Sequence, residues 1–127
     1  FGFAFKANTG DTRESPAITI ARRLLEEHAQ VVISDPQALP NARIDLAAYG
    51  KDSLSFVEDP YEAAAGCDAI AVMTEWGIYR ELDYGKIFAS MSKPAFLFDG
   101  RNLLDHRRCH EIGFNVYPIG KPPLTHY

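Results

Sequence analysis

Apolar runs alternate with amphipathic or polar stretches along this chain, and this alternation predicts strands separated by helices. The predicted strands are residues 1–5, 30–34, 53–57, 69–73, 95–98 and 115–117. The predicted helices are residues 16–28, 59–65, 78–80, 84–91 and 105–112, and residues 38–51 are expected to be loop with a short helix. Strands and helices that alternate in this way indicate a parallel sheet. We therefore expect a doubly wound α/β fold, with a mostly parallel Rossmann-like sheet and helices on both faces.

The same pattern predicts which residues are buried. Residues 69–73 and 95–98 are apolar throughout, which is typical of central strands covered on both faces. The buried face of the first helix is expected to hold four apolar residues, Ile18, Ala21, Leu24 and Leu25. That helix is expected to begin at Ser15 and Pro16, because serine is a good N-cap and proline suits the first helical position.

Polar motifs follow three of the predicted strands at the point where each strand ends. Residues 6–14 follow the first strand, Thr74-Glu75-Trp76 follows the fourth, and Asp99-Gly100-Arg101 follows the fifth. Because parallel strands end at the same edge of a sheet, we expect the motifs to line one crevice, where open α/β sheets bind ligands. Lys6 and Arg13 in the first loop suit a phosphate. The residues by themselves thus predict an anion-binding α/β module.

Composition limits the kinds of partner. The chain has 127 residues, 46% of them hydrophobic and 24% charged, which predicts one ordinary globular domain. A net charge of -4 argues against binding to nucleic acid or to a membrane surface. No apolar run approaches the roughly 20 residues of a membrane span, and no signal peptide is recognised. Cys67 and Cys109 have no disulfide or metal-ligand spacing, so we expect a reducing cytoplasm.

Several other motifs have a simpler interpretation than a functional site. Neither glycine-rich phosphate fingerprint is present, so the chain alone is not expected to hold a dinucleotide. His106 and His110 are spaced like two metal ligands on a helix, but adjacent arginines would repel a cation, and no metal site is expected. Trp76 is interpreted mainly as a packing residue. Glu75 is a candidate acceptor for a ribose or for Lys6.

The motifs also carry a resemblance. Residues 2–6 (Gly-Phe-Ala-Phe-Lys), residues 9–16 (Thr-Gly-Asp-Thr-Arg-Glu-Ser-Pro), Thr74-Glu75-Trp76 and residues 98–102 (Phe-Asp-Gly-Arg-Asn) resemble the C-terminal, UDP-binding domain of the UDP-glucose 6-dehydrogenase family. The resemblance covers residues 1–120, the expected domain, and residues 121–127 are expected to form a frayed tail. Because residue 1 already lies inside an apolar run, the chain is interpreted as part of a longer protein.

The resemblance implies roles for four residues. Phe5, Lys6 and Arg101 would contact the UDP-sugar, and Arg13 would reach towards NAD. In this family the catalytic cysteine and the NAD-binding loop lie in the N-terminal and central domains, so the resemblance implies no catalytic residue here and an inactive isolated chain. The parent enzyme would oxidise UDP-glucose to UDP-glucuronate and would be a homo-oligomer.

Two alternatives stay open at this point. In sister enzymes that act on GDP-mannose or UDP-N-acetylmannosamine, the sequence of this domain begins in a similar way. A stand-alone nucleotide-binding module without turnover is the other alternative. For a lobe cut from its neighbours, we also expect an exposed aromatic patch near the motif edge, with four candidates: Phe3, Phe5, Trp76 and Tyr79.

Overall fold

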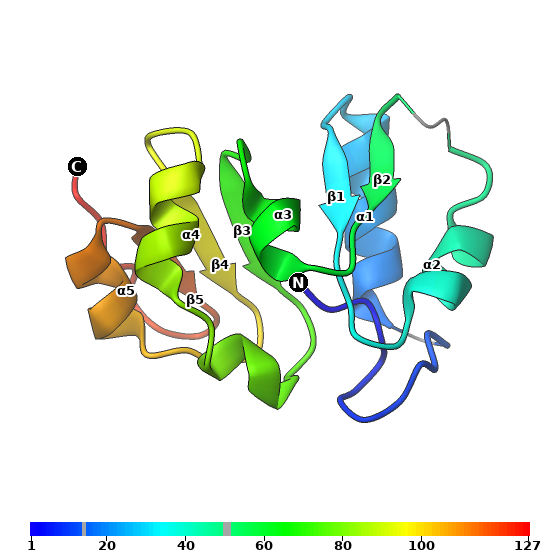
Figure 1. The fold of residues 1–127 in the computed structure, drawn as a ribbon, viewed down its shortest axis with the longest axis horizontal. Coiled ribbons are helices and arrows are strands. Elements are labelled where there is room, and N and C mark those ends of the chain that lie inside the picture. The colour runs from blue at the N-terminus through cyan, green and yellow to red at the C-terminus, as the bar shows by residue number, and fades with distance from the viewer. Residues whose placement is uncertain (14, 50–51) are drawn as a thin grey trace.

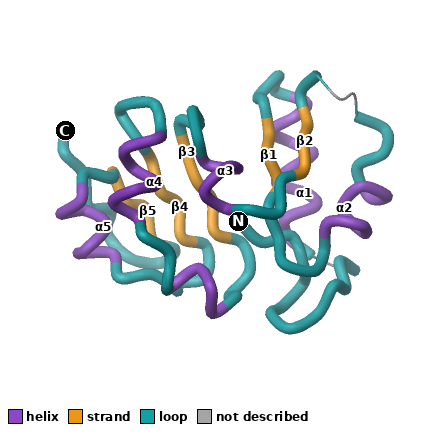
Figure 2. Tube along the Cα trace, in the orientation of Figure 1, coloured by secondary structure: helices purple, strands orange, loops and turns teal. Residues whose placement is uncertain are grey.

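The computed structural model describes residues 1–13, 15–49 and 52–127. The last position of the loop predicted at residues 6–14 and the end of the region at residues 38–51 therefore lie outside the described residues. The described elements follow in the order α1 (Pro16–Glu26), β1 (Val31–Ile33), α2 (Leu39–Asp45), β2 (Leu54–Phe56), α3 (Pro60–Ala64), β3 (Ala69–Val72), η1 (Gly77–Arg80), α4 (Tyr84–Ser90), β4 (Phe96–Asp99), α5 (His106–Ile112) and β5 (Asn115–Pro118). Figure 1 shows this order by colour, and Figure 2 marks helices and strands.

All the strand pairs are parallel among the described residues. β1 pairs with β2, and β3, β4 and β5 form a second ladder in that order. Residues 1–4 lie between the two ladders. The backbone N–H of Gly2 donates to the carbonyl of Ser34 at 2.7 Å, and Phe1 exchanges hydrogen bonds with the backbone of Ala71 and Met73 at 2.8 Å. The resulting order, β2, β1, residues 1–4, β3, β4, β5, is that of a doubly wound sheet.

The first predicted strand is wrong as a regular element. Residues 1–5 have no strand assignment, because the N–H groups of Phe3 and Ala4 both donate to the carboxylate of Asp35 instead of to a neighbouring strand. Gly2 is required at this crossing. Its φ is +92°, and a Cβ there would lie 2.6 Å from the Cβ of Thr74. The close approach fastens residues 1–4 to the end of β3.

Helices cover both faces of the sheet, as expected. Figure 1 shows α1 behind β1 and β2, and α3 and α4 in front of the sheet. Right-handed crossovers require this arrangement, because the strand order reverses direction after β2. The helices begin where local caps dictate: Ser15, Asp59, Asp83 and Asp105 each accept a hydrogen bond from a backbone N–H in the first turn.

We expected β3 and β4 to be buried on both faces of the sheet, and this prediction is wrong. Ile70, Val72 and Leu97 are buried on one face, whereas on the other Ala69 is exposed and Phe98 is 44% exposed. The crossover helices around β3–β5 lie on a single face, since the connections all run in one direction. Phe98 stacks on Tyr117, with the ring centroids 5.0 Å apart.

Two smaller burial predictions also need correction. In α1 the buried residues are Ala17, Ala21 and Leu25, whereas Leu24 is 43% exposed. The predicted aromatic patch is wrong for three of its four residues. Phe3, Trp76 and Tyr79 are buried, and only Phe5 is exposed. These rings fill the core between the two ladders instead of facing a neighbour.

Residues 121–127 contact the domain. Leu124 and Val116 exchange backbone hydrogen bonds of 2.7 and 2.9 Å, which form an antiparallel bridge beside β5. The backbone N–H of His126 donates to the side chain of Asn115 at 2.7 Å. Fraying of this tail and the domain boundary at residue 120 stay predictions. Among the described residues, no helix combines the length and apolarity needed to cross a bilayer.

Candidate anion-binding edge

The carboxyl edge of the sheet is organised around Asp35, which lies two residues after the end of β1 and is 1% exposed. Its Oδ2 accepts from the backbone N–H groups of Phe3 at 2.8 Å and Ala4 at 3.1 Å, and from the indole Nε1 of Trp76 at 3.1 Å. Its Oδ1 accepts from the N–H groups of Gln37 and Ala38, both at 2.8 Å. The sequence analysis did not single out this aspartate. Its bonds to Gln37 and Ala38 are those of an ordinary turn, whereas its other donors, at residues 3, 4 and 76, lie far away in sequence and leave no local signal.

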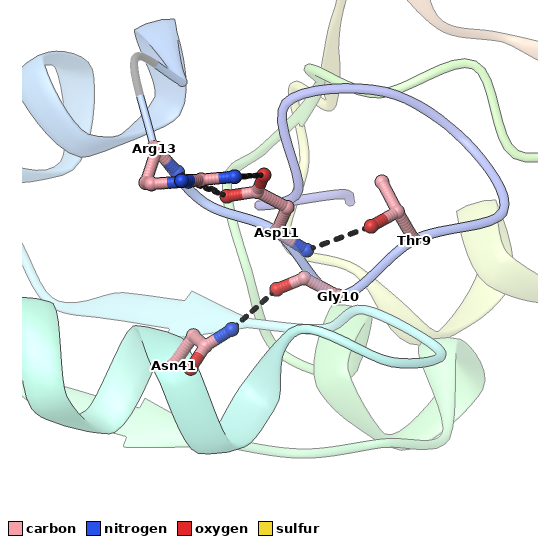
Figure 3. Close-up of polar contacts among 5 residues, drawn as sticks. All are labelled: Thr9, Gly10, Asp11, Arg13 and Asn41. Carbon is pink, nitrogen blue, oxygen red and sulfur yellow. Dashed lines mark hydrogen bonds and ion pairs between the residues drawn. The ribbon is translucent and has the colours of Figure 1, made fainter.

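The first loop is anchored to α2. The amide of Asn41 donates to the carbonyl of Gly10 at 2.5 Å, and the hydroxyl of Thr12 donates to Asp45 at 2.5 Å. Figure 3 shows the turn at Thr9, Gly10 and Asp11, closed by the N–H of Asp11 on the hydroxyl of Thr9 at 3.1 Å. A Cβ at residue 10 would lie 3.0 Å from the carbonyl of Gln37, so this loop sits close against the turn before α2.

Arg13 forms a two-pronged ion pair with Asp11 (Figure 3). Its Nη2 lies 2.7 Å from Oδ2, and its Nε donates to Oδ1 at 3.0 Å. The hydrogen bond from the Arg13 side chain lowers the pKa of the Asp11 carboxyl to about 2. The arginine side chain is 88% exposed. The Arg13 side chain therefore lies at the surface, paired with Asp11.

Arg101 and Glu75 form an ion pair between the loops that follow β4 and β3. The two side chains are 34% and 37% exposed. Sequence reasoning offered Lys6 or a ribose as the partner of Glu75, whereas the structure pairs it with Arg101. Arg101 is also held through its backbone, because its N–H donates to Oδ1 of Asp99 at 3.1 Å.

Asp99 holds the loop that follows β4, through hydrogen bonds to its backbone. It is fully buried. Its Oδ2 accepts from the backbone N–H of Leu104 at 2.8 Å and lies 2.8 Å from Nε2 of His106. Burial raises the pKa of the Asp99 carboxyl, but the hydrogen bonds from Leu104, His106 and Arg101 outweigh burial and hold it below its ordinary value. These contacts give Asp99 a structural role in the loop after β4, with His106 as its side-chain partner.

Phe5 and Lys6 lie at the same edge. The hydroxyl of Thr74 donates to the carbonyl of Ala4 at 2.7 Å, so the start of the first loop is fastened beside Glu75. Phe5 is 45% exposed and Lys6 is exposed. The structure thus brings Phe5, Lys6 and the Glu75–Arg101 pair to one edge, with the phenyl ring and the ammonium accessible to a ligand.

A cleft of about 570 Å³ lies beside this edge, lined by Ser34, Pro36, Glu58, Asp59, Pro60, Glu62, Ile78 and Tyr79. None of the four predicted binding residues lines it. Its acidic side chains disfavour an anion, so we place the candidate anion site on the open edge and not in this cleft.

The cysteines are not activated nucleophiles. Burial raises the pKa of the Cys109 thiol to about 12 and also raises that of Cys67. Cys67 donates from Sγ to the carbonyl of Ala63 at 3.3 Å. Neither environment favours the reactive thiolate.

The chain is similar in sequence to known nucleotide-sugar dehydrogenases. The sequence pattern of the UDP-glucose/GDP-mannose dehydrogenase family, UDP binding domain, matches residues 1–106. The chain is 48% identical over 133 residues to the UDP-glucose 6-dehydrogenase of Caenorhabditis elegans, covering 100% of this chain and 28% of that protein. It is 45% identical over 129 residues to the UDP-glucose 6-dehydrogenase of Drosophila melanogaster, covering 94% of this chain and 27% of that protein. The chain thus spans just over a quarter of these curated relatives.

Solved structures of nucleotide-sugar dehydrogenases share the fold of this chain. A UDP-glucose dehydrogenase from Pyrobaculum islandicum superposes with a TM-score of 0.70 at 34% identity, covering 92% of this chain and 23% of that one. An NDP-N-acetyl-D-galactosaminuronic acid dehydrogenase from Methanosarcina mazei superposes with a TM-score of 0.79 at 22% identity, covering 99% and 25%. The second likeness concerns the fold alone.

Proposed function

The chain belongs to the UDP-glucose/GDP-mannose dehydrogenase family, and from this premise we propose that it is the UDP-sugar-binding, C-terminal domain of an NAD-dependent UDP-glucose 6-dehydrogenase. The parent enzyme would oxidise UDP-glucose to UDP-glucuronate. Identity of 44–48% to UDP-glucose 6-dehydrogenases over almost the whole chain supports this substrate over the sugars of the sister enzymes.

The observation that carries the proposal is the fixed position of Arg101 at the carboxyl edge. An arginine fork suits the paired oxygens of a diphosphate, and this one is oriented through its backbone by Asp99 and through its guanidinium by Glu75. Lys6 would add a mobile positive charge. Phe5 would pack its exposed ring against the nucleotide-sugar.

NAD is not held by this chain on its own. The sequence has no dinucleotide fingerprint, and the only residue proposed to reach NAD is Arg13, which stands on the surface in its pair with Asp11. NAD would accept the hydride when bound to the N-terminal domain. No step of that transfer is assigned to residues of this chain, in which we propose no catalytic residue.

The remaining partners are proposed from the length of the relatives. They contain more than three times as much chain, which supports partner domains for NAD binding and catalysis in the same polypeptide. A cytoplasmic homo-oligomer is the proposed context. No feature of the described residues favours a stand-alone module.

The test is calorimetric titration of UDP and of NAD into the chain and its single variants. UDP should bind more tightly than NAD. A charge-assisted hydrogen bond contributes about 1.5–3 kcal/mol, so Arg101→Ala should weaken UDP binding by about one to two orders of magnitude, and Lys6→Ala should also weaken it. Arg13→Ala is the matched control and should have little effect. Equal affinities for the wild type and Arg101→Ala, or a dominant effect of Arg13→Ala, would overturn this placement of the nucleotide.

A further inference from the structure

Glu75 and Arg101 extend from neighbouring strands. Val72 of β3 is paired with Asp99 of β4 in the parallel ladder, and both chains leave the sheet directly after these positions. Glu75 and Arg101 then meet in the ion pair. Their contact bridges the two loops at the point where the proposed diphosphate would bind.

The carboxylate of Glu75 depends on this contact. Its Oε2 is inaccessible to water and has no hydrogen-bond donor with good geometry among the described residues. The guanidinium of Arg101 lies against this oxygen and is the positive charge that compensates it. The Glu75 side chain as a whole is 37% exposed, so the pair is half-buried, and moving Arg101 away to reach a ligand would cost Glu75 its compensating charge.

Arg101 can keep this contact and still bind an anion. A guanidinium has five N–H donors in a planar fork, and a single carboxylate oxygen engages only part of it. The Arg101 side chain is 34% exposed, so the pair does not bury it completely. Holding a long, flexible arginine in one orientation also removes much of the entropy that a ligand would otherwise have to restrict.

We propose that Glu75 is a positioning residue for Arg101: it keeps the guanidinium aimed along the sheet edge and stays in contact while the diphosphate binds. This inference rests on the proposed function. The opposing possibility is that Glu75 competes with phosphate for the same fork. The two differ in sign, because removing a positioning residue weakens binding and removing a competitor strengthens it.

The experiment is a double-mutant cycle measured by calorimetric titration of UDP. Glu75→Ala should weaken binding by roughly tenfold and Glu75→Gln by roughly threefold, since glutamine keeps an acceptor but loses the charge. In the Arg101→Ala background, either change at Glu75 should alter affinity by less than about twofold, because coupled residues do not act independently. Glu81→Gln, an exposed glutamate in the same connection between β3 and α4, is the matched control and should bind like the wild type.

The outcomes separate the hypotheses. Tighter UDP binding by Glu75→Ala would show competition, and an equal loss with and without Arg101 would show a merely structural role. Either result overturns the inference. If UDP binding is lost on Arg101→Ala but unchanged on Glu75→Ala, only this inference fails. A wild-type chain that binds no UDP would overturn the proposed function itself. Urea unfolding of each variant verifies that the fold is intact.

Discussion

The indole Nε1 of Trp76 donates to Oδ2 of the buried Asp35 at 3.1 Å. The same carboxylate accepts the backbone N–H groups of Phe3 and Ala4. One side chain thereby ties the start of the chain, the end of β1 and the loop after β3 into the edge that presents Lys6 and Arg101. A small displacement at Asp35 would be transmitted to both proposed ligand-binding loops.

Asp35→Asn should therefore be strongly destabilising. The amide nitrogen would face N–H groups that now have an acceptor, and each unsatisfied buried donor costs about 1–3 kcal/mol. We expect the free energy of unfolding in urea to fall by about 2–4 kcal/mol. Trp76→Phe, which removes one donor and keeps most of the ring, should cost less. Equal losses for the two variants would contradict the central role of the carboxylate.

Stability should depend on pH through Asp99. The folded carboxyl has a pKa below its ordinary value, so the unfolded chain binds the proton more readily and stability rises with pH in this range. The contribution is complete above the unfolded pKa of about 3.9 and is lost as the pH falls through the folded value. In urea unfolding, the difference between the wild type and Asp99→Asn should be large at neutral pH and should shrink below about pH 4. A difference that does not change with pH would refute this assignment.

Both thiols should react slowly in the native protein. At pH 8 a thiol with a pKa of about 12 holds roughly a thousandfold less thiolate than an ordinary cysteine. Reaction of the Cys67→Ser variant with a thiol reagent therefore reports Cys109 alone, and it should accelerate by at least that factor on unfolding in urea. Fast labelling of the folded variant would mean that Cys109 is more accessible than its burial indicates.

The isolated chain should not oxidise UDP-glucose. It lacks a dinucleotide fingerprint, and neither thiol is activated. Absorbance of the reduced nicotinamide should stay constant when UDP-glucose and NAD are mixed with the chain. Turnover that disappears on substitution of Cys67 or Cys109 would overturn the assignment of catalysis to other domains.

Neighbouring residues of β4 should differ in their effect on stability. Leu97 is fully buried and Phe98 is 44% exposed. Leu97→Ala should lower the free energy of unfolding by about 2–5 kcal/mol, whereas Phe98→Ala should cost less, because its ring remains partly in water and loses mainly the stacking on Tyr117. Similar losses in urea unfolding would mean that the second face of the sheet is covered in solution.

The helices and the edge on which the motifs lie were predictable, because their signals are local. An N-cap such as Ser15 acts within one turn. Apolar runs correctly located β1 to β5, whereas the run at residues 1–5 does not form a regular strand. Parallel order then places the motifs at one edge. The charge of Lys6 and Arg13 already suited a phosphate, and the family resemblance added Phe5 and Arg101. The roles of all four residues in binding stay predictions.

The sequence by itself thus determined the alternation of strands and helices, the edge that carries the polar motifs, and the family. Only the tertiary structure decided that Glu75 pairs with Arg101 and not with Lys6, that Asp35 accepts hydrogen bonds from residues 3, 4 and 76, and that Phe98 is partly exposed. These features depend on which residues meet across strands distant in sequence, and on which face the crossover helices cover. No local pattern contains that information, because the contacts form only when the whole sheet has assembled.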